Sequence, residues 1–312
     1  MTLVSGLVEE ICREKNISLD CLSCGWILKL VKNEKTRFII GINFDLNTKS
    51  ISMILNDKYA TYEILKSFGI PIIEHRILFT PDSRFHQLYG GTFENALSFF
   101  HEYHDDVVIK PNKWSEGKGV FHCTDVVMLE KKLFLLLKEK FSVSICPFYR
   151  IKTEYRIFYL DGKIEFMYSK VKPVLIWDGI LTVEELLKQF NQHFPDKAIF
   201  RENLEINDLH YIPKEWELYE FSWKFNLSWG AQVNLEVSDF ARWHIEEIVN
   251  KISRCLNIRF VTIDIIQDEN DEFKVMEING NVCLTQFIHL VEGGREIAKR
   301  IYAKAIDVMF TD

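Results

Sequence analysis

Two apolar segments near the end of the chain carry polar side chains that could hold a metal ion. Residues 260–266 read Phe-Val-Thr-Ile-Asp-Ile-Ile, and residues 273–279 read Phe-Lys-Val-Met-Glu-Ile-Asn. The carboxylates of Asp264 and Glu277 and the amide of Asn279 are costly to bury unless a cation neutralises the charge. Magnesium prefers such oxygen donors and completes its coordination with water and substrate phosphates. The pattern predicts a magnesium site, although a hairpin with solvent-facing acids has the same pattern.

The two segments must pair for these donors to meet. Residues 267–271 between them are acidic and turn-prone, which favours a hairpin. Because side chains alternate between the faces of a strand, Glu277 and Asn279 share one face. Antiparallel pairing can then place Asp264 opposite them.

A second candidate site is a lysine at the end of a predicted strand, followed by a glycine-containing loop. Residues 107–110 read Val-Val-Ile-Lys, and residues 111–120 contain two glycines and two lysines. Glycines let backbone N–H groups approach a phosphate, and lysines add positive charge. The loop has neither the Walker A pattern nor the dinucleotide-binding fingerprint. A phosphate-binding lid and a plain surface turn both remain compatible with it.

The composition is that of a globular protein with room for two or three lobes. The chain has 312 residues, of which 47% are hydrophobic and 27% charged, with a formal net charge of −7. That charge argues against nucleic acid or an anionic membrane as a general partner. No apolar run approaches the ~20 residues of a membrane span. With early acidic residues unlike a secretory signal, we expect a soluble cytoplasmic protein.

Seven cysteines are scattered along the chain, which favours reduced thiols over a disulfide framework. Cys21 and Cys24 have the spacing of half a zinc site, but no second pair follows, so packed thiols are favoured there.

Helix and strand signals punctuate the rest of the chain. A helix over 57–68 has Asp57 as its N-cap and Gly69 at its end. Its predicted buried stripe is Ala60, Ile64, Leu65 and Phe68. Further helices are predicted over 1–12, 93–103, 125–140, 182–190 and 295–309 and from residue 238, and further strands over 25–31, 36–42, 141–148, 154–160 and 163–170.

These elements occur in an order that resembles the ATP-grasp ligases from residue 57 to the C-terminus. The matching residues are Asp57-Lys58, Thr61 and Gly69-Ile70-Pro71, then Ile109-Lys110-Pro111 and residues 117–120, then Glu154-Tyr155-Arg156, and finally Asp264 with Glu277-Ile278-Asn279.

Two further segments resemble the ATP-grasp part of cyanophycin synthetases and bifunctional glutathione synthetases. The first comprises Asp178-Gly179, residues 181–186 and Asn191, and the second is Asn226-Leu-Ser-Trp-Gly230.

The resemblance implies an α+β protein with the ATP-grasp fold, in which two lobes with antiparallel sheets clamp ATP. Residues 1–56 would form a short N-terminal α/β lead-in. Residues 57–150 would form the small lobe with its glycine-rich lid, and residues 151–312 the C-terminal lobe with the metal-binding hairpin.

The resemblance also implies residue roles. The magnesium ligands are Asp264, Glu277 and Asn279, with two ions expected and Mn²⁺ able to substitute. The predicted catalytic residues are Arg156, Lys170, Lys172 and Asn226, of which the three cations lie near the phosphates or the acyl phosphate. The predicted ATP-binding residues are Lys110, Ser115, Gly117, Lys118, Gly119, the adenine linker with Cys146, Phe148 and Tyr149, and Glu154 on the ribose.

The implied function is an ATP- and Mg²⁺-dependent carboxylate–amine ligase that forms an amide bond through an acyl phosphate, on an amino acid or peptide. A homodimer is the family's usual state. A non-catalytic nucleotide-binding protein and a kinase acting on a hydroxyl are the alternatives.

Several residues depart from the family pattern and leave the substrate open. Relatives often have Asp and Gly where this chain has Lys113 and Trp114. They usually have an acidic residue at Pro147 and a glycine at Ala231. The arginine expected just before the Asn226 segment is missing, and Ser222 or Lys224 stands nearby instead. The resemblance covers only the ATP-grasp part of both named relatives, so their overall reactions are not implied.

Overall fold

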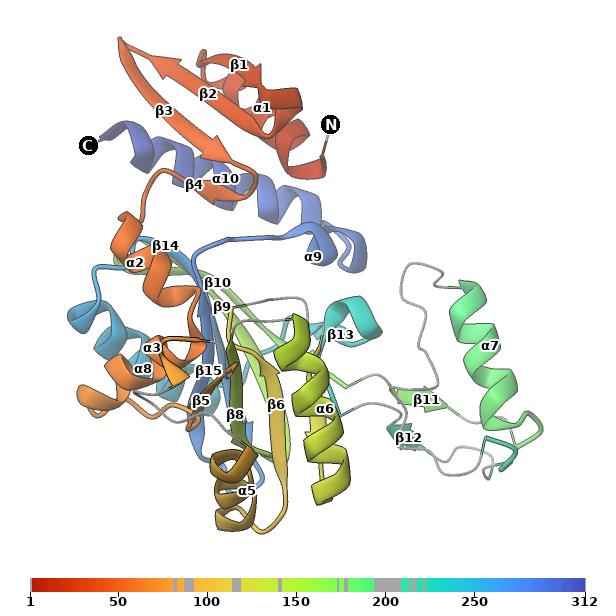
Figure 1. The fold of residues 1–312 in the computed structure, drawn as a ribbon. Coiled ribbons are helices and arrows are strands. Elements are labelled where there is room, and N and C mark those ends of the chain that lie inside the picture. The colour runs from red at the N-terminus through yellow and green to blue at the C-terminus, as the bar shows by residue number, and fades with distance from the viewer. Residues whose placement is uncertain are drawn as a thin grey trace.

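The computed structural model describes residues 2–80, 83–86, 93–113, 119–139, 142–172, 174–176, 179–193, 209–212, 214, 218–220 and 223–311. Three antiparallel sheets of four or five strands organise these residues, together with a two-stranded ribbon (Figure 1). None of the helices in the described ranges is long and apolar enough to span a membrane.

The five-stranded sheet is the centre of the C-terminal lobe. Its strand order is β13 (Gln232–Asn234), β10 (Lys163–Val171), β9 (Ile151–Leu160), β14 (Phe260–Asp268) and β15 (Phe273–Asn279). Strand alternation turns Ile157 and Ile263 toward α8 (Asp239–Cys255), where they share a buried core with Ile245 and Val249. The opposite face is free to carry the polar residues described below.

The second sheet belongs to the small lobe. Its order is β5 (Arg76–Phe79), β8 (Ser142–Pro147), β6 (Val107–Pro111) and β7 (Phe121–Cys123). Helices α5 (Phe93–Glu102) and α6 (Val126–Glu139) cover one face, with Ile109 and Ile145 in the core between them. Lys110 and Ser144 alternate to the other face, where they stand opposite each other in register.

The N-terminal region packs onto the C-terminal end of the chain. Helix α1 (Leu3–Glu14) and strands β1 (Ser18–Leu22), β2 (Ile27–Lys32), β3 (Lys35–Ile40) and β4 (Asn43–Phe44) lie over α10 (Gly294–Thr311), at the top of Figure 1. The short helix α9 (Thr285–Leu290) completes this layer, and a 3₁₀ turn (Ser23–Gly25) joins β1 to β2. Ile39 and Tyr302 are buried in the shared core, and Phe44 stacks on Tyr302 at 5.3 Å.

Helices α2 (Lys49–Leu55) and α3 (Lys58–Ser67) connect this region to the small lobe. The predicted cap of α3 is confirmed, because the Asp57 carboxylate accepts a hydrogen bond from the Ala60 backbone N–H at 3.0 Å. After α3 the chain lies alongside β15, since Ile73 donates its backbone N–H to the Val275 carbonyl. Segment 57–73 therefore touches both sheets.

The predicted buried stripe of α3 is wrong in part. Leu65 is buried, but Phe68 is 55% exposed, and Thr61 and Tyr62 are buried instead. Phe68 is the C-cap residue and lies past the last helical turn, whereas the Thr61 hydroxyl donates to the Ile54 carbonyl at 2.9 Å. The bond to Ile54 satisfies the Thr61 hydroxyl, so this polar side chain can be buried.

Most of the other predicted elements are confirmed. The predicted strands over 154–160 and 163–170 pair as a hairpin, and its turn residues Asp161 and Gly162 both have positive φ, as a two-residue turn of this kind needs. The capping box of α7 (Val183–His193) forms between Thr182 and Glu185, although the helix extends past the predicted end. Helices α2 and α9 were not predicted, and neither were the short strands β1, β4, β5, β7, β11, β12 and β13.

A small outlying unit contains α7 with the ribbon of β11 (Val174–Ile176) and β12 (Leu218–Glu220), at the right of Figure 1. A 3₁₀ turn, η4 (Leu227–Trp229), follows it and leads back to β13.

Candidate active site

The predicted metal ligands lie together on the face of the C-terminal sheet that α8 does not cover. Asp264 on β14 stands directly opposite Glu277 on β15, and Thr262 stands opposite Asn279. The Asn279 amide donates to the Glu277 carboxylate at 2.9 Å. Asp264 is 0% exposed, so the alternative of a hairpin with solvent-facing acids does not apply to it.

Two cations from the neighbouring strands neutralise Asp264. The Arg156 guanidinium donates from Nε to Oδ1 at 2.8 Å and from Nη2 to Oδ2 at 2.6 Å. The Lys170 ammonium donates to Oδ1 at 3.3 Å. Burial by itself raises the pKa of Asp264, but these two cations overcome that effect and lower the pKa to about 2. The carboxylate is therefore ionised.

Glu154 is the second buried carboxylate of the face and is paired with the same lysine. Lys170 and Glu154 stand opposite each other on β10 and β9, and the ammonium donates to the carboxylate. Each residue is only 4% exposed. Burial raises the pKa of Glu154 and outweighs the opposing effect of Lys170. Two acids and two cations thus form one buried network across three strands.

Two lysines, Lys110 of β6 and Lys58 of α3, lie near Glu277 at the edge of this face. Lys110 is 8% exposed and lies at the end of β6, as its strand-end position in the sequence predicted. The Lys58 ammonium lies 3.8 Å from the Glu277 carboxylate. Burial lowers the pKa of Lys58, Glu277 opposes that shift, and the nearby Lys110 adds to it. Two cations therefore stand at the side of the metal-ligand face.

Lys58 was not among the predicted site residues. Its place follows from the Asp57 cap, which fixes the first turn of α3, and from Asn112, whose side-chain oxygen accepts the Tyr59 backbone N–H at 3.1 Å. The sequence signal that could have found it is the Asp57-Lys58 pair itself, at the start of a well-capped helix.

A buried histidine lies beneath the two lysines. His75 Nδ1 lies 2.7 Å from the Ser144 hydroxyl, and the ring is 1% exposed. Burial, together with the charges of Lys110 and Lys58, lowers the pKa of His75 well below its usual value. A neutral imidazole adds no further positive charge there.

The residues of the predicted adenine linker belong to an apolar cluster between the two sheets. Cys146, Phe148 and Tyr149 pack with Ile266 of β14 and Met276 of β15. Phe148 also stacks on His122 at 3.8 Å. The apolar cluster borders the charged network, because Ile266 is paired in register with Glu154. Apolar side chains beside a charged patch suit a flat base joined to phosphates.

The segment before the predicted Asn226 element also contacts this apolar cluster. The Trp223 ring lies 5.4 Å from that of Phe148. Lys224 stands close in sequence to the position where relatives have an arginine. It donates to the Val120 carbonyl at 2.9 Å, and burial lowers its pKa to about 8. Asn226 caps the 3₁₀ turn by accepting the Ser228 N–H at 2.9 Å, and Lys172 lies over the Phe225 ring at 5.5 Å.

Of the predicted lid residues, Gly119 lies in the described part of the chain. Its φ is +69°, and a Cβ there would come 3.1 Å from Leu136 and 3.2 Å from Pro111. A glycine is needed at this position. Ser115, Gly117 and Lys118 lie outside the described residues, as do Trp114, Asp178 and Ser222.

The donor set fits magnesium in its chemistry. Asp264, Glu277 and Asn279 supply two carboxylates and an amide on one face, and magnesium takes few protein ligands. Within the described ranges no cluster of three or more His, Cys, Asp and Glu side chains could hold a metal. The third protein oxygen would therefore come from Asn279.

Comparison with known proteins identifies relatives of this chain. It is 28% identical over 190 residues to the glutathione biosynthesis bifunctional protein GshAB of Streptococcus mutans, covering 58% of this chain and 23% of that protein. It is 24% identical over 170 residues to the cyanophycin synthetase of a Nostoc species, covering 50% of this chain and 17% of that protein. The chain thus spans about a quarter or less of the length of these two relatives. No family model matches it.

Solved structures share its fold. A bifunctional glutathione synthetase from Pasteurella multocida superimposes with a TM-score of 0.57 at 18% identity, covering 97% of this chain and 44% of that chain. A D-alanine–D-alanine ligase from Bacillus anthracis gives 0.54 at 15% identity, covering 85% and 68%. The chain therefore has the ATP-grasp fold, and its homologues are bifunctional glutathione synthetases and cyanophycin synthetases, as its motifs indicated.

Proposed function

We propose that this chain is an ATP- and Mg²⁺-dependent carboxylate–amine ligase that forms ADP and phosphate. The observation that carries the proposal is the pairing of Asp264 with Glu277 across β14 and β15, next to Lys58 and Lys110. Its homologues and fold neighbours are themselves ligases. Lysines beside paired carboxylates suit a triphosphate bound with a metal ion.

The nucleotide would span the boundary between the apolar cluster of the linker and the charged network. Adenine packs between the linker residues and Ile266, and the ribose lies toward Glu154, which Lys170 holds in place. The phosphates then extend toward Lys58 and Lys110. Gly119 and residues 115–118 are proposed as the lid that keeps water from the reaction.

Asp264, Glu277 and Asn279 would hold two magnesium ions, and Mn²⁺ would be accepted in their place. When bound, the metal neutralises charge on the phosphate oxygens. Ligation by Asp264 requires Arg156 or Lys170 to share one of its oxygens, because both oxygens already accept hydrogen bonds.

The reaction needs little covalent chemistry from the protein. A carboxylate oxygen of the substrate attacks the γ-phosphorus, and the bond to the β-phosphate oxygen breaks to release ADP. An amine then attacks the acyl carbon, expels phosphate and loses a proton. Charge develops on the transferred phosphoryl oxygens and then on the acyl oxygen, so fixed cations accelerate both steps. We assign this role to Arg156, Lys170 and Lys172, with Asn226 ordering the turn beside them.

The carboxylate and the amine are proposed to belong to amino acids or peptides, because the names of the relatives describe glutathione, cyanophycin and D-alanyl-D-alanine synthesis. A cytoplasmic location and a homodimer are proposed with them.

The test is a screen of pairs of amino acids and short peptides for ADP formation, with mass spectrometry of the products. A ligase releases phosphate only when acid and amine are both present. Phosphate retained on a hydroxyl would identify a kinase, and tight ATP binding without turnover of any pair would favour a binding protein. Glu277→Ala serves as the inactive control.

A further inference from the structure

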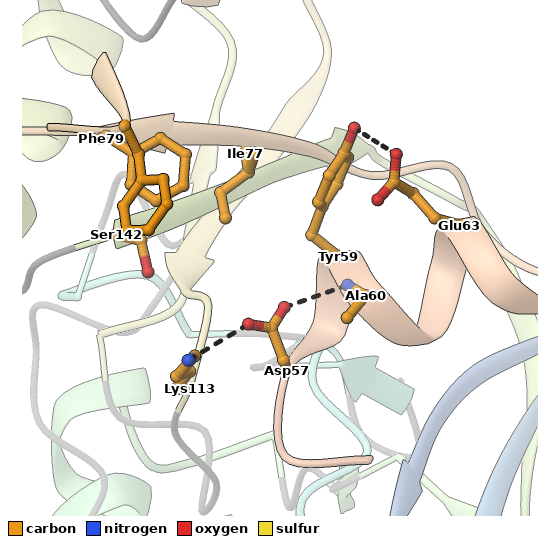
Figure 2. A pocket seen from close by; sticks show the side chains of 9 residues that line it. Asp57, Tyr59, Ala60, Glu63, Ile77, Phe79, Lys113 and Ser142 are labelled. Atoms are coloured by element: carbon orange, nitrogen blue, oxygen red, sulfur yellow. Dashed lines mark hydrogen bonds and ion pairs between the residues drawn. The ribbon is translucent and has the colours of Figure 1, made fainter. Parts of the chain in front are cut away.

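A separate pocket lies between the first turns of α3 and the small-lobe sheet (Figure 2). Its volume is about 240 Å³. Ser142, which lines it, lies two residues before Ser144 on β8 and therefore on the same face of the sheet. Lys58 turns toward Glu277, whereas its neighbours Asp57 and Tyr59 line the pocket. The pocket is lined by Asp57, Tyr59, Ala60, Glu63, Ile77, Phe79, Phe85, Lys113 and Ser142.

One wall of the pocket is apolar. Ile77 and Phe79 alternate to this face of β5, while Leu78 between them is buried against the helices on the other face. The Phe79 and Phe85 rings pack at 5.5 Å between centroids. A wall of one aliphatic and two aromatic side chains favours an apolar group of a ligand.

The rim carries opposite charges. The Lys113 ammonium lies 3.4 Å from Asp57 Oδ2, and its side chain is 65% exposed. Asp57 Oδ1 accepts the Ala60 N–H at 3.0 Å and the Asn112 amide at 2.9 Å. Asp57 therefore keeps its structural bonds if Lys113 turns to a ligand. The Tyr59 hydroxyl donates to Glu63 Oε1 at 3.0 Å, which orients an exposed carboxylate on the same rim (Figure 2).

We propose that this pocket binds a free amino acid with a branched or aromatic apolar side chain. The α-carboxylate would pair with Lys113, the α-ammonium with Glu63, and the side chain would cover Ile77, Phe79 and Phe85. A nucleotide or other polyanion is disfavoured, because Asp57 and Glu63 stand on the rim. A purely apolar ligand would form no ion pair with Lys113 or Glu63. The site goes beyond the proposed ligase activity and does not rest on it.

Calorimetry on the nucleotide-free full chain tests the proposal. L-Leucine or L-phenylalanine should bind, while 4-methylpentanoate and isoamylamine, each lacking one charge, should bind at least about tenfold more weakly. The same preparation is titrated with ATP, so a failure of this site and a failure of the ligase proposal give separate signals.

Two variants complete the test. Ala60→Leu fills the pocket with a good helix former, and it should abolish amino-acid binding while ATP affinity and melting temperature stay unchanged. Glu63→Gln keeps an oxygen that can accept the Tyr59 hydroxyl and should lower the affinity for the amino acid about tenfold. Glu130→Gln on α6 should leave that affinity unchanged. The proposal is overturned if no amino acid binds at millimolar concentration, if the singly charged analogues bind equally well, or if Ala60→Leu binds as the parent does.

Discussion

The Arg156 guanidinium donates hydrogen bonds to both carboxylate oxygens of Asp264 across the pair of strands β9 and β14. Lys170 on the next strand, β10, donates to the same carboxylate, and the Asp264 side chain is fully buried. A predicted magnesium ligand is therefore also a structural tie between strands. Its neighbour Glu277 is 21% exposed and contacts Asn279 of its own strand and Lys58 of α3.

Replacing Asp264 should accordingly reduce stability much more than replacing Glu277. Asp264→Ala leaves the buried Lys170 and the partly buried Arg156 without their shared carboxylate, which costs about 3–5 kcal/mol. Glu277→Ala should change the free energy of unfolding by about 1 kcal/mol or less. Urea unfolding measures both values. Equal losses in the two variants would contradict the tie that we describe.

The pH dependence of stability should report the same carboxylate. Its folded pKa of about 2 lies below the ordinary value of 3.8. The unfolded state therefore binds the proton more readily, and the stabilisation is complete above about pH 4 and disappears as the pH falls through about 2. The loss amounts to roughly 2–3 kcal/mol.

The loss of unfolding free energy between about pH 4 and pH 2 should be absent in Asp264→Asn. It should remain in Asp20→Asn, because the Asp20 carboxylate is 53% exposed in the parent protein. Unfolding free energies measured by urea at a series of pH values give the comparison. Parallel curves for the two variants would refute the assignment.

Removing Glu277 should stop the proposed reaction without unfolding the protein. Glu277→Ala lacks one of the two carboxylates of the metal face, so ADP formation and the Mg²⁺ dependence of ATP binding should both be lost. Calorimetry with and without Mg²⁺ measures the second effect. Glu269→Ala, at the exposed hairpin turn, is the control, and a Glu277→Ala protein with normal turnover would disprove the metal assignment.

Lys110 and Lys58 should each contribute to nucleotide binding. Lys110→Met and Lys58→Met each remove a charged donor to phosphate, which corresponds to about 1.5–3 kcal/mol and a rise in Kd of about tenfold to a hundredfold. Lys163→Met, at the exposed start of β10, should leave the Kd of ATP unchanged. An unaltered ATP affinity in Lys58→Met would remove that residue from the site.

The amino-acid sequence was enough to predict what depends on neighbours along the chain. Period-two alternation and the acidic turn placed Asp264, Glu277 and Asn279 on one face of a hairpin, and the register confirms it. The Asp57 cap is local in the same sense. The resemblance of several segments to the ATP-grasp ligases also implied the fold.

The tertiary structure decided which charges meet. Arg156 and Lys170 lie 108 and 94 residues from Asp264 in sequence, and they reach it only because β10, β9 and β14 are neighbours in the sheet. Strand order depends on the packing of whole segments, which local patterns do not specify. For the same reason Lys58 beside Glu277, and the pocket between α3 and β5, became visible only in the folded chain.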